Sequence, residues 1–273
     1  MLKQIEQWQI EGNAPEAYER YLVPAFFASW AEELVHRADI KEGEQILDAA
    51  CGTGIVARTA ALHNGNGSTI SGIDVNEQML LVARNVSSKL NVKIEWQQGD
   101  AAALPYPDRS FDVVFCQQGL QFVPDPSAVL REMYRVLAPG GRLALNVLRP
   151  LEHNPVYKPL SKALERHAGE EAGAMMRSPF PSWSIEQLRD LITDAKFEKV
   201  NITSVIKQVR FPSAEEFLRQ EASSSPLAGP IAELDIDSRQ ALLSELEESL
   251  RDYTDDEGVV FPMETFIAVG YKL

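Results

Sequence analysis

The sequence predicts an α/β fold in which a mostly parallel sheet carries helices on both faces. Short apolar runs alternate with helix-like stretches, helix start and stop signals separate them, and a glycine-rich turn joins the first run to the first helix. Strands that alternate with helices are typical of parallel sheets, because the chain must cross back before each new strand. The predicted strands are residues 45–49, 69–73, 92–96, 112–116 and 142–148, and the predicted helices between them are 54–62, 76–88 and 126–137.

Helix signals support these boundaries. Residues 15–37 have helical periodicity that is interrupted at Pro24, where the missing backbone donor should kink or restart the helix. Asn76 begins a later helix, and Pro126 lies in the first turn of another, which APGG at 138–141 should end.

Beyond Arg149 the pattern loosens. Residues 150–182 contain several prolines and one expected helix, so we interpret them as an insertion over the sheet edge. Ser184 is a suitable N-cap for a returning helix, and a long alternating strand, two helices and a final strand follow. We therefore divide the chain into an N-terminal helical cover (1–43), an α/β core (44–149), the insertion (150–182) and a C-terminal part (183–273) with a helical insertion at 212–258.

Charge, cysteine content and hydropathy limit the partners and the compartment that can be expected. The 273 residues carry a net charge of -14, which disfavours a nucleic-acid partner, because such binding depends on clustered Lys and Arg. Cys51 and Cys116 lie far apart in apolar contexts, which suits a reducing compartment. The first twelve residues lack the apolar core of a secretory signal, and no run reaches the ~20 apolar residues of a membrane span. We expect a cytoplasmic protein.

The stretch ILDAACGTGIVA, residues 46–57, has two possible ligands. Gly52, Gly54 and Ala57 match the dinucleotide fingerprint GxGxxA, which offers bare backbone amides to a pyrophosphate. Asp48, however, ends the preceding strand, where its carboxylate would face that pyrophosphate. Like charges at ~4 Å cost on the order of 1 to 4 kcal/mol. S-adenosylmethionine carries an ammonium, a sulfonium and no phosphate, so Asp48 favours this cofactor.

Two further carboxylates follow predicted strands. Asp74 ends the second strand, where it can accept both hydroxyls of a ribose, although a nicotinamide dinucleotide would use the same acid. Asp100 follows the third strand and could accept the exocyclic amine of adenine, with Ala101 contributing a backbone amide.

Four stretches in this order extend the match. DAACGTG, GIDVNEQML, GDAAALPYPDRSFDVVF and REMYRVLAPGGRLAL resemble the successive motifs of class I S-adenosylmethionine-dependent methyltransferases, specifically the small-molecule branch similar to ubiquinone/menaquinone-biosynthesis methyltransferases. The resemblance covers roughly residues 44 to 148. It implies a Rossmann-like seven-stranded sheet whose last strand runs antiparallel, with 150–182 and 212–258 as helical lids over the substrate.

The resemblance also implies roles for single residues. The cofactor-binding residues that it implies are Tyr21, Asp48, Gly52, Gly54, Asp74, Val75, Met79, Asp100, Ala101 and Gln117. Tyr18 and Tyr21 lie three apart on the first helix, which such proteins commonly fold over the cofactor. The segment QQGLQFVPD departs from the family, because many relatives have a His pair near Gln121 and Phe122. One familiar site for a catalytic base is therefore missing.

Other residues are candidates for acceptor binding. His153 is placed to deprotonate an acceptor, and the candidate substrate contacts are Tyr18, Gln121, Arg149 and Asn154. Cys51, at a helix N-terminus, invites a nucleophilic role, but the family uses that position for small packing residues.

We expect methyl transfer to an O, N or C nucleophile of a small apolar or amphipathic molecule, without a metal. Alternatives are an NAD-dependent oxidoreductase, a non-catalytic S-adenosylmethionine-binding protein, and methyl transfer to RNA or protein. The sequence leaves open the acceptor, the attacked atom, the use of a base and the oligomeric state.

Overall fold

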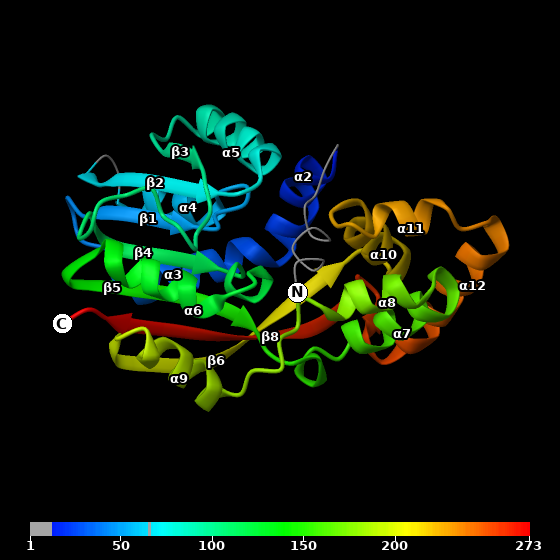
Figure 1. Ribbon diagram of the computed structural model, residues 1–273. Helices are drawn as coiled ribbons and strands as arrows, with labels where there is room; N and C mark the ends of the chain where they lie inside the picture. The colour runs from blue at the N-terminus through cyan, green and yellow to red at the C-terminus, as the bar shows by residue number, and fades with distance from the viewer. Residues whose placement is uncertain (1–12, 65–66) are drawn as a thin grey trace. The chain divides into compact units, whose positions relative to one another are not determined.

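The computed structural model describes residues 13–64 and 67–273 (Figure 1). Its strands form one sheet in the order β3-β2-β1-β4-β5-β8-β6, with β7 paired to β8. The strands are β1 (Gln45–Ala49), β2 (Thr69–Asp74), β3 (Glu95–Gln98), β4 (Phe111–Gln117), β5 (Leu137–Leu148), β6 (Glu198–Phe211), β7 (Thr254–Asp255) and β8 (Gly258–Tyr271).

Strands β1 to β5 run parallel to one another. Strand β8 runs against them: the Gly140 N–H, near the start of β5, donates to the Lys272 carbonyl at 2.6 Å, and the Arg149 N–H, just after β5, donates to the Glu264 carbonyl at 3.0 Å. The prediction of a mostly parallel sheet with an antiparallel last strand is thus confirmed. Strand β7, which was not predicted, adds two residues that pair with the first part of β8.

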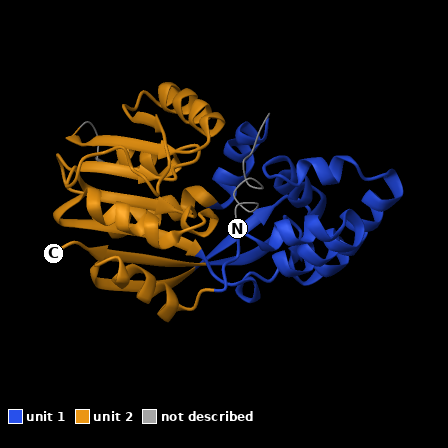
Figure 2. Cartoon of the chain, in the orientation of Figure 1, with its two compact units in different colours: residues 1–26, 148–182, 206–264 blue, residues 27–147, 183–205, 265–273 orange. Residues whose placement is uncertain are grey.

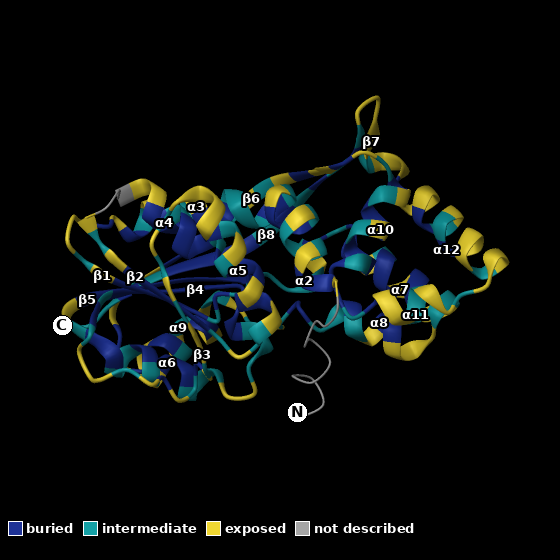
Figure 3. Ribbon diagram, turned by 90° about the horizontal axis from the view of Figure 1, so that it is seen from above, coloured by how far each residue is buried: buried dark blue, intermediate teal, exposed yellow. Residues whose placement is uncertain are grey.

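Helices cover both faces of the sheet, as predicted. Helix α3 (Ala28–Ala38) and helix α4 (Ile55–Asn64) pack on the face that Ile46 and Phe115 line. Helix α6 (Pro126–Val136) and helix α9 (Ile185–Asp194) pack on the other face, over Leu47 and Val114. Figure 3 shows the resulting buried strands between partly exposed helices. Helix α5 (Glu77–Leu90) lies beside β2 and β3.

The boundary between α6 and β5 differs from the prediction. Helix α6 ends at Val136, and the APGG segment at 138–141 belongs to β5 instead of forming a helix-ending loop. The strand pairing shifts register between Phe111 and Val113, which accommodates the extra residues as an irregularity in β5.

The chain folds into two compact units (Figure 2). Unit 2 comprises residues 27–147, 183–205 and 265–273, and unit 1 comprises residues 1–26, 148–182 and 206–264. The described helices of unit 1 are α2 (Ala14–Ala17), most of the π-helix η1 (Tyr18–Phe27), α7 (Tyr157–Ala168), α8 (Glu170–Arg177), α10 (Ala214–Ser223), α11 (Ala228–Ala232) and α12 (Ile236–Ser249), together with short 3-10 turns η4 (Leu151–His153) and η5 (Arg251–Tyr253). Its interior includes a cluster of aromatic rings, Tyr157, Phe180, Phe211, Phe217 and Phe261.

Pro24 does not restart the first helix. The chain passes from α2 through a π-helix, η1 (Tyr18–Phe27), directly into α3. A π-helix pairs each carbonyl with the amide five residues on, and such wider turns accommodate a residue that lacks its own N–H. The interruption predicted at Pro24 therefore takes the form of a widened helix.

The segment 150–182 contains two helices where one was expected. Pro159 lies in the first turn of α7, where amides have no helical partner, so the proline does not break the helix. Gly169, at φ 95°, separates α7 from α8. Ser184 caps α9 as predicted and forms a capping box with Gln187.

Candidate functional site

The glycine turn follows β1 and opens into α4. Ala50, Gly52 and Gly54 have positive φ angles of 54°, 54° and 80°, so the backbone turns sharply within five residues. The Cys51 N–H donates to the Ile73 carbonyl at 3.0 Å, and the Gly54 N–H donates to the Cys51 carbonyl at 2.8 Å. These bonds fix the turn against the carboxyl end of β2, at the edge where open α/β sheets bind ligands.

Asp48 lies beneath this turn. Its side chain is 1% exposed, and Oδ2 accepts the Ala57 N–H at 3.0 Å, at the start of α4. Burial raises the pKa of Asp48 from 3.8 to about 7, and the charge of Asp74 adds to the shift. Its other oxygen, Oδ1, is buried and has no hydrogen-bond partner in the described part of the chain. The hydroxyl of Thr53, on the turn itself, is also buried and has no hydrogen-bond partner among the described residues.

Asp74 joins the turn to the end of β2. Its Oδ2 accepts the Gly52 N–H at 2.7 Å, and its Oδ1 accepts the Asn76 N–H at 2.9 Å. Burial raises the pKa of Asp74, against the effect of these backbone amides. A carboxylate has about four acceptor positions, and the backbone amides of Gly52, Asn76 and Val75 leave part of them unused. Asp74 can therefore accept ligand hydroxyls while it holds the turn.

Asp100 lies after β3 and is exposed. Its Oδ1 accepts the Ala102 N–H at 2.8 Å, and Ala101 beside it is 6% exposed. The Gly99 N–H donates to the Asp74 carbonyl at 3.0 Å, which links the ends of β2 and β3. The predicted residues Asp48, Gly52, Asp74 and Asp100 thus come from the adjacent carboxyl ends of three strands.

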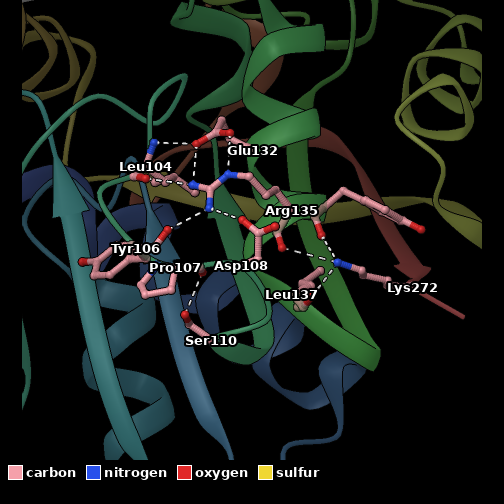
Figure 4. Close-up of polar contacts among 10 residues, drawn as sticks. Leu104, Tyr106, Pro107, Asp108, Ser110, Glu132, Arg135, Leu137 and Lys272 are labelled. Atoms are coloured by element: carbon pink, nitrogen blue, oxygen red, sulfur yellow. Dashed lines mark hydrogen bonds and ion pairs between the residues drawn. The ribbon is translucent and has the colours of Figure 1, made fainter.

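A network around Arg135 fixes the loop that follows Asp100 (Figure 4). The guanidinium of Arg135, on α6, donates to the carbonyls of Leu104 and Tyr106, each at 2.8 Å. It also pairs with Asp108 at 2.9 Å and Glu132 at 2.8 Å, and Glu132 in turn accepts the Leu104 N–H at 2.8 Å. Hydrogen bonds from Arg135 hold the pKa of Glu132 below its usual value. We did not single out Arg135 in the sequence, although a Glu three residues before an Arg on a helix is a recognisable pair.

Known proteins match the part of the chain that builds this site. The model of the methyltransferase domain family matches residues 47–145. Ubiquinone/menaquinone biosynthesis C-methyltransferase of Cronobacter sakazakii is 32% identical over 190 residues, which cover 63% of this chain and 73% of that protein. Demethylmenaquinone methyltransferase of Listeria monocytogenes is 32% identical over 188 residues, which cover 67% of this chain and 78% of that protein. The chain belongs to the class I S-adenosylmethionine-dependent methyltransferases.

A solved structure agrees in fold. Phosphoethanolamine N-methyltransferase of Haemonchus contortus, in complex with S-adenosylhomocysteine, superposes with a TM-score of 0.61 at 19% identity and covers 95% of this chain and 57% of that one. Membership of this family makes the chain an enzyme whose cofactor is S-adenosylmethionine, as the sequence predicted. A nicotinamide-dependent oxidoreductase, the first alternative, is not favoured.

Two apolar residues of the methyltransferase follow Asp74. Val75 is 51% exposed, whereas Met79 is 8% exposed in the first turn of α5. Asn76 caps this helix and accepts the Gln78 N–H at 2.9 Å and the Met79 N–H at 3.3 Å. Asn76 is thus confirmed as the start of α5, and it holds Met79 next to the strand end.

Gln117 is the last residue of β4, and Gln118 follows it. The Gln117 side chain donates from Nε2 to the Phe27 carbonyl at 3.0 Å, so it connects β4 to the end of the π-helix. Gln118 has a positive φ of 53°, and its N–H donates to Asn146 Oδ1 at 3.0 Å. Its own Oε1 is buried without a hydrogen-bond partner in residues 13–64 and 67–273. We predicted Gln117 and missed Gln118, which two polar residues directly after an apolar strand could have indicated.

Three predicted acceptor residues form a connected group in unit 1. Arg149 pairs with Glu264, and its Nη2 lies 2.9 Å from His153 Nε2. A guanidinium only donates, so His153 Nε2 must accept in this contact. Asn154 is fully buried and bonds the Arg149 carbonyl and the Glu264 N–H, each at 3.0 Å. A base role for His153 or a substrate role for Asn154 would require these bonds to open.

The remaining predicted residues lie elsewhere. Tyr18 and Tyr21 are both on the π-helix, and the guanidinium of Arg219 lies 4.7 Å from the ring centroid of Tyr21. Gln121 is in a 3-10 turn, η3 (Leu120–Phe122), after β4.

Both cysteines are free and buried. Burial raises the pKa of the Cys51 thiol well above its usual value and that of Cys116 to about 12. A high thiol pKa opposes nucleophilic chemistry. No helix within the described ranges is long and apolar enough to span a bilayer.

Proposed function

We propose that the glycine turn holds the methionine part of the cofactor, with Asp48 facing its ammonium. The observation that carries this proposal is the buried Oδ1 of Asp48, which has no hydrogen-bond partner among the described residues, as is also true of the Thr53 hydroxyl on the same turn. A buried carboxylate oxygen without a donor costs free energy, which a ligand N–H would recover. A dinucleotide pyrophosphate offers no such donor.

We propose further that Asp74 accepts the ribose hydroxyls and that Asp100 and Ala101 bind the adenine edge. The lone pairs that remain on Asp74 and the exposure of Asp100 support these roles. Val75 follows Asp74 directly, Met79 lies in the first turn of the next helix, and both offer apolar surface to the base. Gln117 and Tyr21 stay candidate cofactor contacts.

We propose that the acceptor is a small apolar or amphipathic molecule. The names of the relatives make the ring carbon of a hydroquinone-like molecule the first candidate, since they are a C-methyltransferase of quinone biosynthesis and a demethylmenaquinone methyltransferase. The net charge of -14 supports a small acceptor over RNA. Two free cysteines fit a cytoplasmic location.

When bound, the cofactor supplies a methyl group that its sulfonium makes electrophilic. The chain has to hold the acceptor atom in line at ~3 to 3.5 Å and to exclude water. A hydroquinone carbon becomes a better nucleophile when a ring hydroxyl loses its proton, and a positioned base contributes ~10²- to 10⁴-fold. His153 is the candidate base, provided that its Nε2 leaves Arg149.

The test is methyl transfer. Incubation with methyl-labelled S-adenosylmethionine and a metabolite extract, with a hydroquinone that has an unsubstituted ring position as a defined acceptor, should give a labelled product in mass spectrometry. The Asp74→Ala variant should give far less. Label in RNA or protein alone would overturn the small-molecule assignment.

A further inference from the structure

Trp96 packs against two glycines of the cofactor region. It lies on β3, directly opposite Gly72 of β2 in the parallel pairing. A Cβ at Gly72 would lie 2.5 Å from Trp96 Cε3, and a Cβ at Gly54 would lie 2.7 Å from Trp96 Cζ3. Real Cβ atoms do not approach ring carbons so closely. The six-membered edge of the indole therefore occupies the space that side chains at Gly54 and Gly72 would need.

The two glycines of the turn have different surroundings. A Cβ on Gly52 would meet no atom within 4 Å, and the Gly52 N–H is bonded to Asp74. Gly54, by contrast, faces the indole, its N–H is bonded to Cys51, and its carbonyl accepts the Arg58 N–H at 3.0 Å. Gly52 thus leaves its side of the turn open, whereas Gly54 leaves room for Trp96.

We propose that Trp96 is a positioning residue for the cofactor turn. Its rigid ring packs against Gly54 and limits the positions that Gly54 can take. The hydrogen bond from the Gly54 N–H to the Cys51 carbonyl then limits the conformations of the segment between them, which contains Gly52. A glycine-rich backbone is otherwise free to sample several conformations, and ordering it on binding reduces affinity. The inference rests on the proposed cofactor site and adds a residue that lies outside its four family motifs.

The test measures S-adenosylhomocysteine affinity by calorimetry in folded variants. Trp96→Leu should bind roughly tenfold more weakly, which is about the cost of re-ordering one backbone residue. Trp96→Phe keeps a flat ring against both glycines and should stay within about threefold of wild type. The control is Phe197→Leu, which shrinks an aromatic ring on the other face of the sheet; Phe197 is fully buried, whereas Trp96 is partly buried. It should lower stability and leave the affinity unchanged.

A double-mutant cycle isolates the contact. Gly72 has an ordinary strand conformation, so Gly72→Ala is opposed by side-chain contacts only. Its new Cβ would overlap the indole and lie 3.2 Å from Cys51 Sγ, so the substitution should weaken binding. Combining Gly72→Ala with Trp96→Leu should recover part of that loss. If wild type binds and Trp96→Leu binds equally well, the positioning role is wrong and the cofactor site stands. If wild type does not bind S-adenosylhomocysteine, the proposed cofactor site and the positioning role of Trp96 are both wrong.

Discussion

The carboxylate of Asp74 accepts the backbone N–H of Gly52 at 2.7 Å, so the end of β2 is bonded to the turn that follows β1. One side chain therefore supports the turn and, in our proposal, the ribose. The Asn76 N–H on the other carboxylate oxygen fixes the orientation of the group. A substitution at Asp74 should therefore affect both the turn and the binding of the ribose.

Asp74→Asn should weaken binding of S-adenosylhomocysteine by roughly 10- to 100-fold. The carboxamide has one acceptor oxygen in place of two, and hydrogen bonds to a charged group contribute about 1.5 to 3 kcal/mol. Isothermal calorimetry measures the change. Asp252→Asn, at an exposed position of unit 1, is the control. Equal affinities of Asp74→Asn and wild type would remove Asp74 from the ribose site.

Arg135→Met should lower the free energy of unfolding by on the order of 2 kcal/mol, because two loop carbonyls and two carboxylates lose their shared donor. It should also weaken cofactor binding, since the loop begins at Asp100. Arg131→Met is the control on the same helix: its pair with Asp125 is exposed and 3.7 Å long, so it should change stability by less than about 0.5 kcal/mol. Chemical denaturation of both variants compares them. Similar losses would show that the network does not hold the loop.

Glu221→Gln should make the stability of unit 1 less sensitive to a rise in pH between about 5 and 8. Glu221 is buried and accepts the Tyr157 hydroxyl at 2.7 Å, and burial raises its pKa from 4.5 to about 7. A raised carboxyl pKa favours the folded state at low pH, and this contribution is lost as the pH rises from about 4.5 through 7. Between pH 5 and pH 8 wild type should lose about 2 to 3 kcal/mol relative to the variant. Parallel pH profiles of the two proteins would contradict the shift.

The central strands and the turn could be predicted because their signals are local. An apolar run, an acid and closely spaced glycines define the end of β1, and Asn76 and Ser184 act as caps as expected. The depth of Asp48 was not predicted. Side chains alternate along a strand, so Asp48 shares the face of Ile46, and that face is covered by α4. Its carboxylate therefore reaches the first turn of that helix from beneath.

The helical parts outside the core were harder to predict, because proline signals depend on position. Pro24 is accommodated by a π-helix, and Pro159 lies where the first turn of α7 needs no amide. For the candidate acceptor-binding residues, the sequence did not show their hydrogen-bond partners. Arg149, His153 and Asn154 are neighbours in sequence and also in space, but they bond one another and β8, which depends on the distant residue Glu264.

The most direct test of the cofactor site is the pH dependence of S-adenosylhomocysteine affinity, measured by calorimetry for wild type and Asp48→Asn. Asp48 has a pKa of about 7, and the ligand ammonium favours its ionised form. Wild-type affinity should therefore rise roughly tenfold between pH 6 and pH 8. Asp48→Asn should bind more weakly, with little dependence on pH. An Asp48→Asn variant that binds as tightly as wild type, with the same pH profile, would contradict the account.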